Sequence, residues 1–381
     1  MSGVSTYLLN PLDDYWIHQA NLPMNMVASK DKLWLEQSWW GFFDRESGIK
    51  NAFNFWVYPN MRTASVSFTF AVVQPDGSQL SHRMMVSREI TDDRTSMDIG
   101  PARAVVVKPL REWTITLDEN DAIPVSCELQ AHSPVPPGHC EWLEGPKVDE
   151  GESRDPDAGG YGHFNYMAPL VWDGWLKVDG KKYDVKKWLG ARDRSWGILG
   201  MFRDVGIHMW IVASFKDFYV QLWYQELPDG TLRGCKGSII DKDGRYTPIF
   251  RAIHEVEFRT GTRIPTVAKF KILDGNGKWH DLVADVLAKP YCISSGTPVG
   301  DGKAEDFWTP KGSMNIVGET FDDLDEGRDR ERDKILKHRI AGFTFDGTEQ
   351  GEGHFEIAVS QRYGRYRNQI MGDKARHWAK V

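Results

Sequence analysis

One segment of the 381-residue chain gathers charged and aromatic side chains that could do chemistry. It reads WLGARDRSWGILG and spans residues 188–200. If it is a β-strand, alternation puts Asp193 on one face of the sheet, while the opposite face takes Arg192, Arg194 and Trp196. A buried aspartate could serve as a general acid or base, since burial raises its pKa and a nearby arginine lowers it. The alternative is a structural plug that closes a barrel end by ion pairing and cation–π stacking.

Other side chains could share a proton-transfer role with Asp193. Adding water to an alkene, or removing it, needs a proton donor, a site that excludes bulk water and aromatic faces that stabilise a developing cation. We predict Asp193 as the first candidate for the acid, and the further candidates are Glu36, Asp44, Tyr161, His163, Tyr166 and His208. The residues predicted to line a substrate site are Trp40, His163, Trp172, Arg192, Arg194 and Trp196.

Sequence signatures of cofactor, metal and covalent chemistry are missing. There is no Walker A loop, no dinucleotide-binding glycine motif after a strand, no HExxH and no G-x-S-x-G. The eleven histidines are dispersed, and the four cysteines form no C-x-x-C pair. We therefore expect no cofactor and no metal, although a metal site assembled from residues on distant strands stays open.

The composition is rich in large aromatic residues, with 16 Trp, 18 Phe and 12 Tyr. Each buried aromatic ring removes about 150–250 Å² from water, so these residues either fill a core or line a site for a hydrophobic ligand. The formal net charge of −7 argues against nucleic-acid binding, which needs a concentrated basic face. No apolar run reaches the length of about 18 residues that crosses a bilayer.

Short alternating or apolar runs, bounded by Gly, Pro, Asn and Asp, predict β-strands along most of the chain. No segment of helical period separates them, which excludes a βαβ architecture and favours an antiparallel barrel or sandwich. We predict an N-terminal β-barrel domain over residues 1–240 and a C-terminal one over 241–381. A Pro-, Gly- and acid-rich stretch at 132–162 is predicted to be a long loop, either a lid or disordered.

Two segments resemble a known family. GARDRSWG, residues 190–197, matches the pattern G-x-x-[DH]-x-[NS]-W-G, and LEQSWWGFFDRESGI, residues 35–49, is similar to a first barrel strand. Both resemble the carotenoid 1,2-hydratase (hydroxyneurosporene synthase)/AttH-like superfamily, across residues 30–290 in the order of elements. The residues that match by position are Asp193, Trp196 and Gly197. The carotenoid hydratases have His-rich versions of the motif, so a carotenoid substrate is not implied.

The resemblance implies an all-β fold of two tandem lipocalin-like (calycin) antiparallel β-barrels with few short helices. Fungal decalin-forming Diels–Alderases share a similar two-barrel architecture. The family likeness also implies an apolar cavity. Because one fold can host many functions, the chemistry inside that cavity has to be argued from the residues themselves.

Three functions fit these observations. The first is a cofactor-independent lyase, hydratase or isomerase that acts by acid–base chemistry on a small terpenoid, steroid-like or aromatic molecule. The second is a non-catalytic lipocalin-like carrier of a hydrophobic ligand, and the third is a structural protein with a filled interior. An ionisable group with a shifted pKa that faces the ligand favours the enzyme, whereas a wholly apolar site favours the carrier.

The expected setting of the protein follows from the same features. No signal peptide is visible at the N-terminus, so we expect a cytoplasmic protein. Its expected partner is a small hydrophobic molecule, with no nucleic acid and no membrane span. Assembly as a homodimer is one option that the sequence leaves open.

Overall fold

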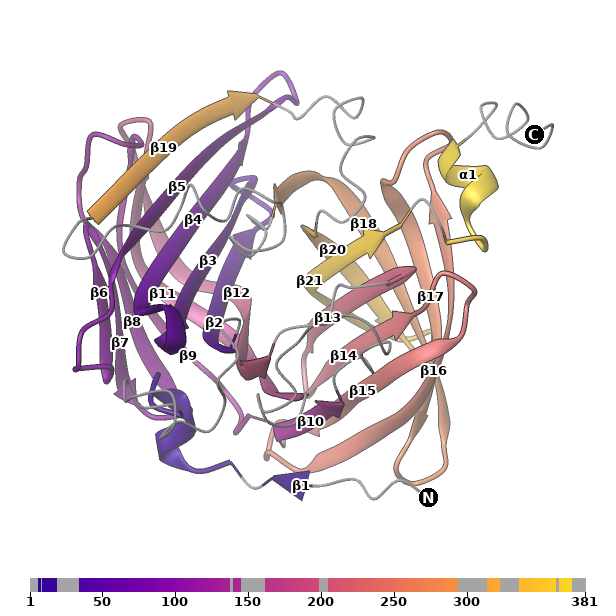
Figure 1. Ribbon diagram of the computed structural model, residues 1–381. Helices are drawn as coiled ribbons and strands as arrows, with labels where there is room; N and C mark the ends of the chain where they lie inside the picture. Colours follow the sequence, from indigo (N-terminus) through magenta and orange to yellow (C-terminus); the bar gives the residue numbers. More distant parts are fainter. Residues whose placement is uncertain are drawn as a thin grey trace, which may run out of the picture.

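The computed structural model describes residues 6–7, 9–18, 34–137, 140–144, 162–198, 205–293, 314–322, 336–360 and 363–371. Within them the chain is almost entirely β-strand, arranged as a large curled sheet beside a closed barrel (Figure 1). This confirms the predicted all-β class with two calycin-like units and few short helices. No helix in the described part of the chain is long and apolar enough to cross a membrane.

The first unit is a curled antiparallel sheet. Its strands are β1 (Thr6–Tyr7), β2 (Trp34–Asp44), β3 (Ile49–Tyr58), β4 (Thr63–Val73), β5 (Gln79–Glu89), β6 (Ser96–Ile99), β7 (Ala102–Lys108), β8 (Glu112–Leu117), β9 (Val125–His132), β10 (Cys140–Glu144), β11 (Gly162–Val178), β12 (Lys181–Ile198) and β19 (Met314–Asp322). Their order is β19-β5-β4-β3-β2-β12-β11-β9-β8-β7-β6, with β10 paired to β11 and β1 to β10. Among the described residues this sheet is not closed, since β19 and β6 end it.

The second unit is a closed antiparallel barrel. Its strands are β13 (Ile207–Phe215), β14 (Phe218–Glu226), β15 (Leu232–Asp241), β16 (Tyr246–Phe258), β17 (Pro265–Asp274), β18 (Trp279–Ile293), β20 (Lys337–Phe345) and β21 (Glu349–Val359). They pair in that order, and β13 closes the barrel by pairing with β21. The short helices are η1 (Pro11–Asp14), η3 (Pro59–Met61) and α1 (Arg367–Met371).

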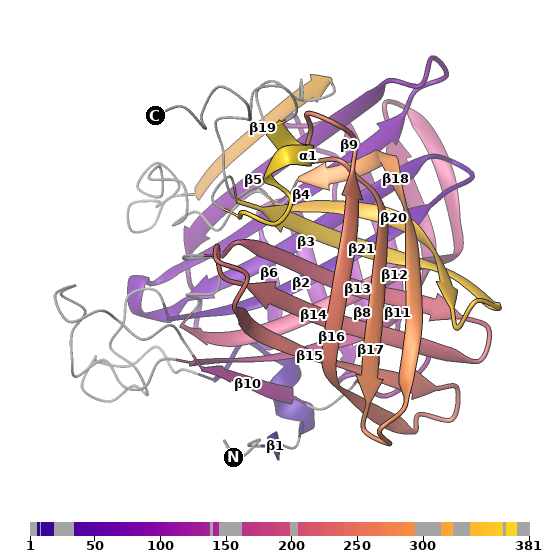
Figure 2. The ribbon, with the colours of Figure 1, turned by 90° about the vertical axis from the view of Figure 1, so that its right-hand side faces the viewer.

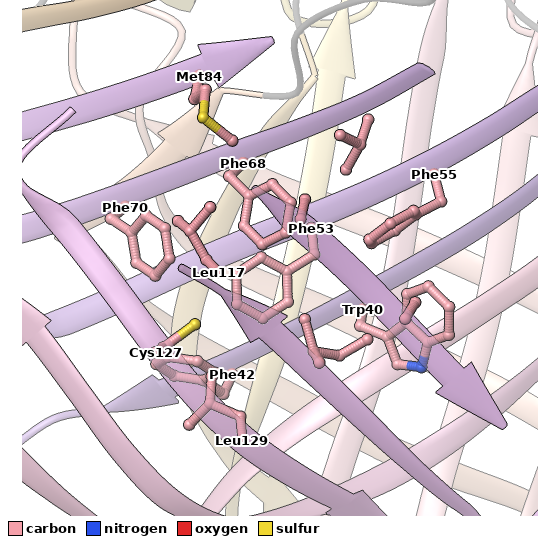
Figure 3. Packing of buried hydrophobic residues seen from close by; sticks show 14 of the residues in the cluster. Trp40, Phe42, Phe53, Phe55, Phe68, Phe70, Met84, Leu117, Cys127 and Leu129 are labelled. Carbon is pink, nitrogen blue, oxygen red and sulfur yellow. The ribbon is translucent and has the colours of Figure 1, made fainter. Parts of the chain in front are cut away.

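Each unit has its own apolar interior, because alternation along the strands sends every second side chain inward. In the first unit, phenylalanines of β3 and β4 meet tryptophans of β2 and β11, and the ring centroids of Phe53 and Phe68 are 4.7 Å apart. Figure 3 shows part of this interior, with Phe53 and Phe68 among the residues from several strands that converge on it. The interior of the first sheet is thus filled by its own side chains.

The chain changes from the sheet to the barrel earlier than predicted. β12 is the last strand of the first sheet before β13 opens the barrel, so β13, β14 and β15 lie in the barrel and not in a domain that ends at residue 240. The sequence did not reveal where the chain passes from the sheet to the barrel, because these strands have the same alternation and the same Asp-Gly turns as the preceding ones. β19 then returns to the first sheet from between two barrel strands, so neither unit is a single continuous stretch of sequence.

The predicted long loop at 132–162 contains a strand. β10 pairs with β11 in register, with Trp142 opposite Phe164. Its sequence, CEWLE, is short and only partly alternating, and Pro-, Gly- and acid-rich residues lie on both sides of it, so the strand gave little signal. Residues 145–161, which carry most of the predicted lid, lie outside the described residues.

The two units pack against each other through a boundary that contains tryptophans. Figure 2 looks onto the barrel, whose strands β13, β14 and β15 cross in front of the first sheet. The buried apolar residues at this boundary come from both units and are Trp39, Ala52, Ala71, Met167, Ala191, Trp210, Val212, Trp223 and Cys292. The side chain of Gln79 also bonds the backbone N–H and C=O of Tyr291, each at 2.9 Å.

Candidate functional site

Strand β12 separates two clusters of polar side chains, one on each face of the first sheet. It pairs with β11 and β2, so that Arg192 lies opposite Trp40 and Asp193 opposite Trp39. The contacts of these residues place Arg192 and Arg194 on the inner face and Asp193 on the face toward the barrel. The alternation predicted from the sequence is therefore confirmed.

On the inner face, Arg192 is held among aromatic rings. Its guanidinium carbon lies 4.7 Å from the ring centroid of Trp40 and 4.2 Å from that of Trp113. Asp14 lies 2.5 Å from this guanidinium and accepts hydrogen bonds from the hydroxyl of Tyr166 and the indole N–H of Trp113, both at 2.9 Å. These contacts neutralise and enclose the buried arginine.

The second arginine of the inner face forms its own closed set of contacts. Arg194 Nη2 donates to Glu36 at 2.6 Å and to the backbone carbonyl of Tyr15 at 2.6 Å. His18 Nδ1 lies 3.0 Å from Glu36, and the imidazole stacks on Trp196 with centroids 3.9 Å apart. Burial alone would raise the pKa of Glu36, but the His18 hydrogen bond and the Arg194 charge hold it below its usual value.

Most of the predicted site residues therefore lie inside the first unit. Arg192, Arg194, Glu36, Tyr166 and Trp40 are fully or almost fully buried and bind one another, η1 or the apolar core. Trp172 belongs to the same core, and Trp196 packs with Trp34 and Tyr166. The Asp44 carboxylate accepts hydrogen bonds from Ser47 in its own turn. Tyr161 and the side chain of His163 lie outside the described residues.

Asp193 has different surroundings on the opposite face. It accepts a hydrogen bond from the side-chain amide of Asn165, whose oxygen in turn accepts from Lys236 of β15 at 2.9 Å. Burial raises the pKa of Asp193 to about 7, against the lowering effect of Lys236. Asp193 retains 9 % of its surface exposed, whereas Arg192 and Arg194 retain none, so it is the most accessible of these three charges.

The barrel contributes a histidine–carboxylate network to the same boundary. Nε2 of His208 lies 2.7 Å from Oε1 of Glu356, and the Gln225 amide donates to Nδ1 of His208 at 3.1 Å. Nδ1 of His338 lies 2.8 Å from Oε2 of Glu356. Burial would raise the pKa of Glu356, but His338 and His208 together hold it at about 2. Glu356 is therefore an ionised, buried carboxylate at neutral pH.

A buried lysine of the first sheet meets this network. Lys50 Nζ lies 3.3 Å from Nδ1 of His354, and burial lowers the pKa of Lys50 to about 8. Burial, reinforced by the Lys50 charge, holds the pKa of His354 well below its usual value. The ring of Trp39 lies 4.9 Å from the rings of both His354 and Trp210.

We call this set the intersheet cluster, and it consists of Trp39, Lys50, Asn165, Asp193, His208, Trp210, Trp223, Lys236, His338, His354 and Glu356. Sequence reasoning found only Asp193 and His208 among them. His354 and Glu356 are two residues apart on one strand, and this spacing alone predicts that their side chains lie on the same face. His338 joins them only because β20 and β21 pair with His338 directly opposite Glu356.

The sequence from residue 9 to residue 292 matches the model of a family of unknown function, DUF8625. The chain belongs to this family. The match covers both β units in part and includes Asp193, His208 and Lys236. None of the curated proteins matches this chain.

Solved structures with a similar fold are known. An AttH candidate from Nitrosomonas europaea superposes with a TM-score of 0.54 at 12% sequence identity, over 86% of the DUF8625 chain and 92% of its own. Kievitone hydratase from Nectria haematococca superposes with a TM-score of 0.53 at 12% sequence identity, over 93% of this chain and 94% of its own. These likenesses confirm, at the level of the fold, the predicted resemblance to AttH-like two-domain calycins.

Proposed function

We propose that this protein is an acid–base enzyme, a hydratase, lyase or isomerase, acting on a small hydrophobic molecule at the boundary between its two β units. The observation that carries the proposal is Asp193, a buried carboxyl with a pKa of about 7 opposite Trp39, which is one of the tryptophans buried at that boundary. A group with that pKa is partly protonated at neutral pH and can both give and take a proton.

The intersheet cluster offers the parts that hydration of an alkene requires. Protonated Asp193 donates its proton to one alkene carbon, and the cation that forms on the other carbon is stabilised by the ring faces of Trp39 and Trp223. Water adds to that carbon, and its surplus proton returns to the Asp193 carboxylate. Lys236, linked to Asp193 through Asn165, stabilises the carboxylate in the interval. Dehydration and double-bond migration use the same proton transfers.

His208 has a positioning role in this proposal. Gln225 donates to Nδ1, so the proton of the neutral imidazole is on Nε2 and is donated to Glu356. The ring of His208 packs against Trp223 at a centroid distance of 5.7 Å. His208 therefore orients Glu356 and Trp223 and does not need to touch the substrate.

Two further considerations favour a substrate site at the boundary between the units and not in the interior of the first sheet. The inner arginines are already paired with carboxylates and enclosed by rings, so a substrate would have to displace several buried contacts. Ligand sites occur preferentially between domains, where hydrophobic walls meet a few polar groups. One protein of similar fold is named a hydratase, which is consistent with this reaction class.

The test compares the wild type with Asp193→Asn in water enriched in oxygen-18. The substrates are a panel of small molecules that contain a carbon–carbon double bond, with kievitone among them, and mass spectrometry follows incorporation of one labelled oxygen. We expect product from the wild type and a loss of at least about 100-fold in the variant, the usual contribution of a general acid. Asp184→Asn, an exposed aspartate on the same strand, is the matched control.

Two results would count against the proposal. Equal turnover by the wild type and Asp193→Asn would remove this residue from the mechanism. Tight retention of panel compounds with unchanged mass would assign the protein to the carriers.

A further inference from the structure

Three potential metal ligands lie on one face of two neighbouring barrel strands. His354 and Glu356 are two residues apart on β21, so their side chains point the same way. His338 on β20 is the direct cross-strand partner of Glu356. One donor atom from each of the three lies within 4.8 Å of the others, and no second group of this kind occurs among the described residues.

Each of the two histidines also has one ring nitrogen that is left without a hydrogen-bond partner in the part of the chain that the structure describes. Among the described residues, Nε2 of His338 and Nε2 of His354 have no hydrogen-bond partner, although each histidine is only 1 % exposed. A buried polar atom without a partner destabilises the folded protein, so such atoms call for an explanation. A bound cation would satisfy both nitrogens at once.

We propose that His338, His354 and Glu356 form a binding site for a divalent transition-metal ion at the boundary between the two units. Two imidazoles and one carboxylate are the ligand set that suits Zn²⁺ and its neighbours Co²⁺ and Ni²⁺. Three protein ligands leave a coordination position open for water or an anionic group. The inference goes beyond the proposed reaction and does not depend on it.

The surroundings of the three ligands resemble those of built metal sites. Glu356 is oriented by His208, whose Nε2 lies 2.7 Å from Oε1, and hydrogen bonds of this outer kind fix a ligand's orientation. Trp39 packs against the rings of His338 and His354 at 5.0 and 4.9 Å, which excludes water from one side. The ligand atoms must approach one another on binding, because bonds of about 2 Å to a common ion bring them closer than 4.8 Å.

Lys50 works against the ion and provides an internal control. Its ammonium lies 3.3 Å from Nδ1 of His354, so its positive charge repels a cation held at Nε2 of the same ring. Replacing it by methionine keeps most of the apolar stem and removes the charge. We expect Lys50→Met to bind metal several-fold more tightly than the wild type.

The experiment uses the full-length protein, stripped by a chelator and dialysed. Co²⁺ is added while visible absorption reports nitrogen and oxygen ligation, and calorimetry measures the binding of Zn²⁺. We expect one equivalent of either ion, with affinity lowered by at least about 100-fold in His354→Gln, since even outer partners contribute about 10–100-fold. The control is His280→Gln, a histidine of the same barrel that lies between Asp274 and Asp346.

The binding measurements on the wild type and the two variants decide whether the site exists. Loss of binding in His354→Gln, with retained circular dichroism and normal binding in His280→Gln, supports the site. The proposal is overturned if the wild type binds neither ion, or if both variants bind as the wild type does. Because the wild type is titrated directly, a variant that fails to fold still leaves the inference testable.

Discussion

At the scale of the residue, neighbouring side chains on one strand meet opposite electrostatic conditions. Arg192 points inward, where Asp14 balances its charge and two indole rings cover it. Asp193 points outward, where it accepts a hydrogen bond from Asn165 and the charge of Lys236 lowers its pKa. Burial favours the neutral form of Asp193 more strongly than the charge of Lys236 opposes it.

The raised pKa of Asp193 makes folding stability depend on pH. Between its ordinary value of 3.8 and about 7, the folded protein keeps a proton that the unfolded chain has released. The free energy of unfolding therefore falls as pH rises through this window, by at most about 4 kcal/mol. Asp193→Asn cannot lose a proton, so we expect it to be more stable than the wild type at pH 8 and nearly equal at pH 4.

Urea denaturation at pH 4 and pH 8 measures this difference. Asp184→Asn, on the exposed part of β12, should retain the pH dependence of the wild type. If the difference in unfolding free energy between the wild type and Asp193→Asn is the same at pH 8 as at pH 4, the raised pKa of Asp193 is contradicted. Combined with the loss of turnover proposed above, a gain in stability would identify Asp193 as a residue kept for function at a cost to the fold.

At the scale of the element, the motif around β12 has a steric reason for its first residue. A Cβ added to Gly190 would lie 2.1 Å from the carbonyl oxygen of Gly41 on β2 and 2.5 Å from the indole nitrogen of Trp172. The first contact is with backbone, which cannot rotate away. Gly190 therefore lets β12 approach β2 closely enough to align Asp193 with Trp39.

We expect Gly190→Ala to destabilise the protein by about 3 kcal/mol, the upper range for overpacking a core. Gly364→Ala is the comparison, because an added Cβ there meets nothing within 4 Å, and its effect should stay within about 0.5 kcal/mol. Chemical denaturation of both variants measures the two changes. A Gly190→Ala protein as stable as the wild type would show that the strands can separate at low cost.

The strands were predictable because alternation and Asp-Gly turns are local signals. The assignment of β13–β15 to the barrel was not predictable, since it depends on which strands pair, and pairing leaves no local mark. The same limit applies to the site. Asp193 and His208 were found from their own segments, whereas Lys50 meets His354 only after residues 304 positions apart are brought together.

At the scale of the whole molecule, the chain passes between the two units more than once. It forms β1–β12 in the sheet, β13–β18 in the barrel, β19 in the sheet again, and β20 and β21 in the barrel. The boundary also buries Trp39, Trp210 and Trp223. Separating the units would expose these rings and break the hydrogen bonds of Gln79 to Tyr291, so the units should not unfold independently.

We expect a single cooperative unfolding transition, with tryptophan fluorescence and far-ultraviolet circular dichroism giving the same midpoint. Trp39→Ala should lower that midpoint for both probes equally, at a cost of about 3–5 kcal/mol, because the cavity it leaves belongs to both units. Two separated transitions in the wild type would contradict this expectation and would mean that the boundary contributes little to stability. A single transition would mean that the intersheet cluster forms only when the whole chain is folded, so that Asp193 acquires its raised pKa as a property of the complete molecule.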